Sequence, residues 1–419
     1  MTDAIIIGAG AAGLMAAREL ILAGKTVRVL EASHRIGGRI FTEYDELSGM
    51  PIELGAEFVH GEAKETTRLL DEARLPTVSV AGVHHGSEHG RIEPLGGAWN
   101  RMSLVFNHLN PRRKHDRPVQ EFLDERPGGA RLSEERKLAR GFVEGFEAAD
   151  MKLISEKSLA EQGDPTEGAT EARRIVRGYG ALLEYLLREV EGQVRLDTAA
   201  RRIVTTDTGV RVIDQRGGQH RARTAILAVP LTALQDESLT LEPDAAAMRR
   251  AASQLVMGHA MRVSVVLKER FWKDKVKDLS YLHTPNRQFA VWWTQSPVMS
   301  PMLTAWAGGP PATALSHSAD VESVVLAEMA RAFNMRRSRV DALVESVHTH
   351  DWTRDAHIRG AYSYVGVGGV TAPKRLARPI SPNVFMAGEA GEPDDGGTVE
   401  AAIKSGKRAA GQVLRRLSS

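Results

Sequence analysis

The first forty residues contain the feature that most constrains how this chain folds. A short apolar run at 4–7 leads into three glycines spaced G-x-G-x-x-G over 8–13, and a second apolar run follows at 26–30. Runs this short, each stopped by a turn, predict buried parallel strands. The Ala- and Leu-rich stretch 11–23 between them predicts a helix. We therefore expect the strand–turn–helix–strand unit of a dinucleotide-binding domain.

Each glycine of this turn has a separate physical role. Gly8 permits the tight turn, Gly10 leaves the backbone open to a pyrophosphate, and Gly13 lets the helix lie close on the strand. Ala11 and Ala12 open the helix, whose free N–H groups and positive dipole end favour an anionic phosphate. The alternative is an ordinary glycine-rich strand–helix turn, and the acid that follows argues against it.

That acid is Glu31, which ends the second predicted strand and is followed by Ala32. A carboxylate there can accept hydrogen bonds from both hydroxyls of a ribose, and it repels a 2′-phosphate, which argues against NADP. The segment 34–40 adds Gly38 and Arg39, and we expect it to form a second phosphate-contacting loop for an extended dinucleotide. Taken alone, Arg35 or Arg39 could instead be an ordinary charged residue on the surface.

Composition narrows the function classes. The chain has 419 residues, 42% of them hydrophobic, which allows two or three domains with a sizeable core. A net charge of +2 provides no general field for nucleic acid, and the basic cluster at 110–118 is typical of a solvated loop. The lack of cysteine excludes disulfides, thiolate metal sites and a flavin attached through sulfur. With no basic leader and no long apolar run, we expect a soluble cytoplasmic protein without a membrane anchor.

The end of the chain contains a second strand–loop–helix pattern. The apolar run 384–387 predicts a strand closed by a glycine, and Thr398 precedes the final helix as its N-cap. The start of that helix is again a site for negative charge. The residues that we expect to face a ligand here are Gly388, Glu389, Gly397, Thr398 and Val399.

Five segments resemble the flavin-dependent amine oxidase family, which includes monoamine, polyamine and spermine oxidases, L-amino-acid oxidases and histone lysine demethylases. The two most specific are GAGAAGLMAARELILAGKTVRVLEASHRIGGRI at 8–40 and VFMAGEAGEPDDGGTVEAAIKSGKRAA at 384–410. The others are IELGAEFVHG at 52–61, VSVVLKERFW at 263–272 and HDWTRDAHIRGAYSY at 350–364. The flavin-facing motifs are most similar to those of polyamine and spermine oxidases.

The resemblance implies an α/β fold with a Rossmann-type FAD-binding domain and a second, α+β substrate domain built from a sheet and helices. We expect 1–75, 175–255 and 360–419 to form the FAD-binding domain, and 76–174 and 256–359 to form the substrate-binding domain. The two domains would then be made of interleaved segments.

The cofactor implied by the resemblance is one FAD without a covalent link. Gly55, Ala56 and Glu57 fall in the segment that passes the flavin ring in the family, and the final helix would stabilise the charge of the reduced ring. Ala361 occupies the position where monoamine oxidases carry the flavin-linking cysteine.

In the resembling family, an amine loses hydride from its α-carbon to flavin N5, and aromatic side chains orient the amine. Tyr362 falls on one of the two cage positions, and Thr398 falls on the other, as in polyamine oxidases. Glu57 and His60 are expected at the pocket edge, where a carboxylate and an imidazole can bind an amine and take its proton. The alternative for His60 is a position in a surface loop. Trp352 also falls on a position that is aromatic in the family, and its alternative is a buried position in the core.

Arg262 departs from the family pattern, which has a lysine that holds water against flavin N5. Arginine keeps the positive charge but cannot titrate, and its fork is larger than an ammonium. We therefore expect the chain to oxidise its substrate, whereas the electron acceptor can be either oxygen or another molecule.

His84, His85 and His89 lack metal-ligand spacing, so we expect a mobile loop there and no metal site.

Three hypotheses follow. The first is an FAD-dependent oxidoreductase that acts on a small primary or secondary amine, with polyamines among the candidates, and whose imine product hydrolyses to an aldehyde. The second is an FAD-dependent dehydrogenase or desaturase of a non-amine substrate. The third is a flavin-bound interaction module without turnover. A nicotinamide dehydrogenase would leave the loop at 34–40 and the C-terminal segment unexplained.

Overall fold

The strand β1 (Thr2–Ile7) lies inside an eight-stranded sheet and aims the chain into the glycine-rich turn. It pairs in parallel with β2 (Val27–Leu30) on one side and with β13 (Gln219–Leu227) on the other. Both faces of β1 are covered, so Ile5 and Ile6 are buried, which is why this run is continuously apolar. The predicted strand–turn–helix–strand unit is confirmed, and its helix is α1 (Ala11–Leu22).

The computed structural model describes residues 2–46, 48–80, 82–88, 90–162, 171–236, 238–285 and 287–418. The eight-stranded sheet draws on distant segments, because its parallel strands need long crossovers. Its other strands are β10 (Val194–Arg195), β12 (Gly209–Asp214), β11 (Ala200–Thr206), β14 (Thr240–Glu242) and β22 (Val384–Met386). Within the described ranges, no helix has the length and apolar character needed to cross a membrane.

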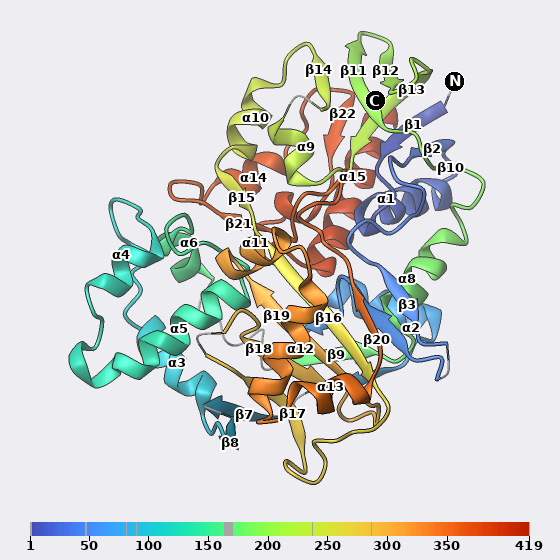
Figure 1. Ribbon diagram of the computed structural model, residues 1–419. Coiled ribbons are helices and arrows are strands. Elements are labelled where there is room, and N and C mark those ends of the chain that lie inside the picture. Colours follow the sequence, from blue (N-terminus) through green and yellow to red (C-terminus); the bar gives the residue numbers. More distant parts are fainter. Residues whose placement is uncertain are drawn as a thin grey trace.

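A seven-stranded sheet forms the other half of the molecule (Figure 1). Its long strand β16 (Ala260–Leu267) is almost wholly buried between β19 (Met302–Gly308) and β20 (Val344–Thr349). The sheet continues through β18 (Val291–Thr294), β17 (Leu279–His283), β7 (Val83–Glu88) and β8 (Arg91–Pro94). The helices α11 (Pro310–Ser316), α12 (Val321–Ala332) and α13 (Arg337–Leu343) contribute to the core on this sheet.

Three smaller sheets also occur among the described residues. Two of them are β3 (Thr42–Tyr44) with β4 (Pro51–Glu53), and β15 (Leu255–Met257) with β21 (Ser363–Val365). The third has β9 (Ala172–Ile175) between β5 (Phe58–His60) and β6 (Thr77–Ser79). The α/β fold class is therefore as predicted.

The segment after residue 76 begins with strands. Residues 77–94 contain β6, β7 and β8, so His84 and His85 lie on a strand and the predicted mobile loop is wrong there. His89 lies outside the described residues. The helices begin only later, and they form the group on one side of Figure 1. They are α3 (Ala98–Phe106), α4 (Val119–Asp124), α5 (Ser133–Gly145) and α6 (Glu156–Glu161).

Helix α1 packs directly against the last helix, α15 (Val399–Ser418). A side chain on Gly406 would place its Cβ only 2.3 Å from the carbonyl oxygen of Ala12, so the two backbones approach as closely as glycine allows. The remaining helices around the eight-stranded sheet are α2 (Lys64–Ala73), α8 (Gly178–Leu187), α9 (Leu231–Gln235), α10 (Ala246–Ala252) and α14 (Ala372–Leu376).

Gly406 gives a direct test of this packing. We expect Gly406→Ala to lower the free energy of unfolding by about 1–3 kcal/mol, as at other overpacked core sites, because α15 must move away from α1. Gly411→Ala is the matched control on the same helix, since a Cβ there would come no nearer than 3.6 Å to the end of the Arg415 side chain. Thermal unfolding of both variants checks the expectation, and a Gly406→Ala protein as stable as its parent would contradict it.

Candidate active site

The glycine-rich turn leaves one face of the backbone open. Gly8 has φ +104°, and a Cβ there would lie 2.4 Å from the oxygen of Ala228. A Cβ on Gly13 would lie 1.9 Å from the oxygen of Gly8, so these two glycines are needed for close packing. Gly10 is different, because its nearest neighbour would be the oxygen of Gly37 at 3.8 Å. An anion can therefore approach the backbone at Gly10 and the start of α1.

The second glycine loop docks on the first. Gly10 and Gly37 form an isolated bridge, and the N–H of Gly37 donates to the oxygen of Ala9 at 2.8 Å. Arg35 does not point to a ligand. Its Nη2 donates to the oxygen of Gly38 at 2.8 Å, and its guanidinium lies 4.1 Å from the ring centre of Phe41. These contacts hold the loop in shape, and its phosphate contact stays a prediction.

Glu31 is held rigidly at the carboxyl end of β2. Its Oε2 accepts the N–H of Ala9 at 2.6 Å, and its Oε1 accepts the N–H of Ser33 at 2.8 Å. Burial raises the pKa of this carboxyl, and the two backbone hydrogen bonds oppose that shift. Each oxygen keeps lone-pair capacity for a ligand hydroxyl.

The glycine-rich turn opens into one cavity of about 2710 Å³ that reaches the seven-stranded sheet. This volume far exceeds the ~300–1,000 Å³ of an ordinary small-molecule site. Gly13 lies beneath its wall, whereas the other predicted site residues line it. These are Gly8, Gly10, Ala11, Ala12, Glu31, Ala32, Gly38, Arg39, Gly55, Ala56, Glu57, His60, Arg262, Tyr362, Gly388, Glu389, Gly397, Thr398 and Val399.

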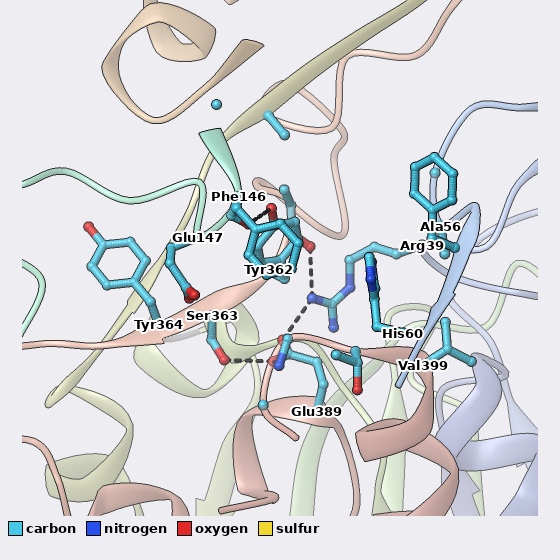
Figure 2. A pocket seen from close by; sticks show the side chains of 18 of the residues that line it. Arg39, Ala56, His60, Phe146, Glu147, Tyr362, Ser363, Tyr364, Glu389 and Val399 are labelled. Atoms are coloured by element: carbon cyan, nitrogen blue, oxygen red, sulfur yellow. Dashed lines mark hydrogen bonds and ion pairs between the residues drawn. The ribbon is translucent and has the colours of Figure 1, made fainter. Parts of the chain in front are cut away.

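The C-terminal loop closes one side of the cavity. The Oε1 of Glu389 lies 2.7 Å from Nη1 of Arg39, and its Oε2 accepts hydrogen bonds from Ser363 Oγ at 2.6 Å and the N–H of Gly397 at 3.2 Å (Figure 2). Arg39 also donates to the oxygen of Ala361 at 2.9 Å. Arg39 and Glu389 therefore tie the second glycine loop to the C-terminal loop, a contact that joins two segments predicted separately.

The helix α15 begins as predicted. The Oγ1 of Thr398 accepts the N–H of Ala401 at 3.0 Å, which makes Thr398 its N-cap. The N-termini of α1 and α15 both reach the cavity wall, because Ala11 and Val399 line it. The positive dipole ends of two helices therefore lie at the wall of the same cavity, where they favour negative charge on a ligand.

Glu57 does not stand free at the pocket edge. Its Oε1 lies 2.6 Å from Nε of Arg174, and its Oε2 lies 2.6 Å from Nη2 of Arg262. The indole N–H of Trp293 also donates to Oε2 at 3.0 Å, and Arg262 donates to the oxygen of Gly55 at 3.2 Å. Burial alone would raise the pKa of Glu57, but the two guanidiniums lower it below its ordinary value. Glu57 therefore positions Arg262, and its carboxylate is fully used.

Tyr362, His60 and a carboxylate that sequence reasoning missed, Glu147, line the same cavity. Tyr362 donates its hydroxyl to the oxygen of Phe146, and the ring of His60 meets that of Phe146 edge-on at 5.4 Å. Glu147 lies beside Tyr362 (Figure 2). In the part of the chain that the structure describes, Glu147 has no hydrogen-bond or ion-pair partner, and burial raises its pKa to about 7.

Two other predicted residues have structural roles. Trp352 is buried and donates its indole N–H to the oxygen of Leu54 at 2.8 Å, so the core position is correct, although its side also touches the cavity. His84 Nδ1 lies 2.9 Å from His283 Nε2 within the cavity wall. No metal-ligating cluster of three or more side chains occurs among the described residues.

Comparison with known proteins places the chain in a family. It belongs to the flavin-containing amine oxidoreductases, whose family model matches residues 11–414. It is 27% identical to polyamine oxidase 2 of Arabidopsis thaliana, over 99% of this chain and 88% of that protein. It is also 27% identical to lysine-specific histone demethylase 2 of Homo sapiens, over 98% of this chain but only 53% of that protein, so it spans about half the length of this relative.

Solved structures show the same fold. Cyclohexylamine oxidase from Brevibacterium oxydans superposes with a TM-score of 0.84 over 100% of both chains at 20% identity. Putrescine oxidase superposes with a TM-score of 0.83 over 99% of both chains at 18% identity. The predicted family and fold class are confirmed, and the chain is an oxidoreductase of that family.

Glu57→Gln tests the buried ion pairs. Loss of the carboxylate leaves two buried guanidiniums without a counter-charge, which we expect to cost about 3–5 kcal/mol at neutral pH. Because the pKa of Glu57 is lower in the folded state, its contribution is complete above its ordinary value of 4.5 and is lost as the pH falls through the folded value. Denaturant midpoints of parent and variant should therefore converge in acid.

The control for this variant is Glu62→Gln, which removes an exposed ion pair with Lys64. It should change stability little, because exposed pairs contribute little. Equal midpoints for parent and Glu57→Gln at pH 7 would show that the pairs do not hold this region together.

Proposed function

We propose that this protein is an FAD-dependent oxidoreductase that oxidises a primary or secondary amine to an imine, which water then hydrolyses to an aldehyde. The observation that carries the proposal is Glu147, a carboxylate without a partner among the described residues, in the cavity wall of a flavin-containing amine oxidoreductase. An ammonium is the natural partner for such a group.

The cavity residues fit FAD. Gly10 and the start of α1 would hold the pyrophosphate, Glu31 would accept the ribose hydroxyls, and the start of α15 would face the flavin ring. When bound, FAD would supply the acceptor for hydride from the amine α-carbon, at flavin N5. Ala361 offers no sulfur and the chain has no cysteine, which supports non-covalent binding.

Three side chains would prepare the amine. Glu147 would bind the ammonium and take its proton, since a pKa of about 7 lets the carboxyl exchange protons near neutral pH. Tyr362 is fixed by its hydrogen bond to Phe146 and would hold the amine against its ring. His60 would close the opposite side. Glu57, by contrast, would act only through Arg262.

Arg262 bears on which electron acceptor reoxidises the flavin. The guanidinium is held on two sides, by Glu57 and by the oxygen of Gly55. Unlike the ammonium of a lysine, an arginine side chain does not serve as a proton donor in proteins. This supports an enzyme that reduces its flavin readily but passes electrons slowly to oxygen. A dehydrogenase of a non-amine substrate and a module without turnover are the other outcomes that the experiments below distinguish.

Glu147→Gln tests the amine-binding role. Acid precipitation of the parent should release FAD, and amines should reduce the flavin without oxygen, at a rate that rises with pH through about 7 as Glu147 ionises. We expect Glu147→Gln to slow reduction about 10²–10⁴-fold, the range for a positioned acid–base group, and to remove that limb of the pH profile. Stopped-flow absorbance measures both.

The matched control is Glu144→Gln, because Glu144 lies on α5 and is paired with Arg140 at 3.4 Å. It should keep the parent's pH profile. A parent that no amine reduces would refute amine oxidation, and reduction by a non-amine substrate alone would favour the second hypothesis.

Arg262→Lys tests the acceptor. In the parent, reoxidation of the reduced flavin by air should lag behind reoxidation by an artificial acceptor. A lysine at this position is shorter and can titrate, so it should speed the reaction with oxygen more than it changes reduction by the amine. Stopped-flow measurement of the two half-reactions decides this, and a parent that already reacts with air as fast as with the artificial acceptor would contradict it.

A further inference from the structure

A row of aromatic rings leads away from Glu147 along the cavity wall. Neighbouring rings touch in sequence, with centre-to-centre distances of 5.0 Å for Phe146 and Phe142, 5.9 Å for Phe142 and Trp99, and 5.5 Å for Trp99 and His84. His84 then stacks on Tyr281 at 4.6 Å. We call this set the aromatic row, and all five residues line the cavity.

The far end of the row is a pair of neutral imidazoles. His84 and His283 share the hydrogen bond described above, and their rings stack at 5.2 Å. Burial lowers the pKa of His84 to about 4 and that of His283 to about 3, and His84 also disfavours charge on His283. Neither imidazole carries a charge at neutral pH, so the pair offers hydrogen-bonding nitrogen atoms and ring faces without a counter-charge for a cation.

The ion cluster beside this end carries excess positive charge. Arg174 and Arg262 share the single carboxylate of Glu57, and Glu53, whose pKa burial raises to about 7, holds only part of a negative charge. Tyr281 belongs to the same neighbourhood, since Arg174 and Glu57 both act on its ionisation. A second ammonium that reached the row would therefore meet net repulsion.

Two aromatic rings near the ion cluster already carry a guanidinium of the protein on their faces. The guanidinium of Arg174 lies 5.3 Å from the ring centre of Phe58, and that of Arg262 lies 5.5 Å from that of Trp293. Cation–π attraction on these rings is thus already used by the protein. An uncharged tail loses nothing here and gains from burial against the rings.

We propose that the aromatic row binds the tail of the substrate and selects amines with an uncharged aromatic or aliphatic tail over diamines and polyamines. The inference rests on the proposed amine oxidation, with Glu147 as the partner of the one reacting amine. It assigns Trp99, His84, Tyr281 and His283 as specificity-determining residues.

The first test compares two isosteric substrates on the parent enzyme. Heptylamine and hexamethylenediamine have the same length, and the second carries an ammonium in place of the terminal methyl. We expect kcat/KM for heptylamine to be at least about tenfold higher, because the row would have to bury an unpaired charge. Equal values, or a preference for the diamine, would overturn the inference while leaving amine oxidation intact.

The second test places a carboxylate at the far end of the row, at the partner of His84. His283→Glu should shift the kcat/KM ratio toward the diamine by at least about tenfold, whereas His283→Gln, which keeps the site neutral, should retain the parent's preference. A His283→Glu enzyme that binds flavin and keeps the parent's ratio would place the substrate tail elsewhere.

Binding separates the two proposals. Dissociation constants of both amines, taken anaerobically from the change in the flavin spectrum or from calorimetry, should show the same order as kcat/KM. If neither amine reduced the flavin, amine oxidation would be refuted, but tighter binding of heptylamine would still support the row as its binding surface. Tighter binding of the diamine would refute the row in either case.

Discussion

Close packing of α1 against α15 is the contact on which the candidate site depends. Gly406 meets the backbone at Ala12, and this approach brings the start of the chain and its last segment to one cavity. The glycine-rich turn supplies one helix N-terminus, and Thr398 caps the other. Neither end alone forms a site for a long anionic ligand, because each offers only one set of free N–H groups. The contact between two distant helices therefore defines the site.

The ion cluster around Glu57 joins the three-stranded sheet to the seven-stranded sheet in a comparable way. Glu57 is near β5, Arg174 is on β9, and Arg262 and Trp293 belong to the seven-stranded sheet. Such a buried cluster is costly unless every charge is matched, and one carboxylate for two guanidiniums leaves an excess. In our proposal, the same excess also limits which ligands the neighbouring wall accepts. Structural and selective roles thus follow from one set of contacts.

Local patterns in the sequence predicted the parts of the site that short-range geometry determines. The spacing of Gly8, Gly10 and Gly13, the acid at Glu31 and the N-cap at Thr398 each depend on a few neighbouring residues. The partners of Glu57 could not be read in this way, since Arg174 is 117 residues away and Trp293 is 236 residues away. The partners of Arg35 could not be read from the sequence for a related reason, because its guanidinium donates to carbonyls of its own folded loop.

Glu147 shows why pairing matters more than residue type. Both Glu57 and Glu147 are carboxylates in the cavity wall, and the sequence around Glu57 is the more distinctive. Two guanidiniums lower the pKa of Glu57 and use its oxygens, whereas burial without a partner raises that of Glu147 to about 7. A paired carboxylate holds its neighbours in place, and an unpaired one can still gain from binding a cation. We therefore propose that the less conspicuous glutamate carries the chemistry of this wall, and that the charge excess around Glu57 limits the bound cation to one per substrate.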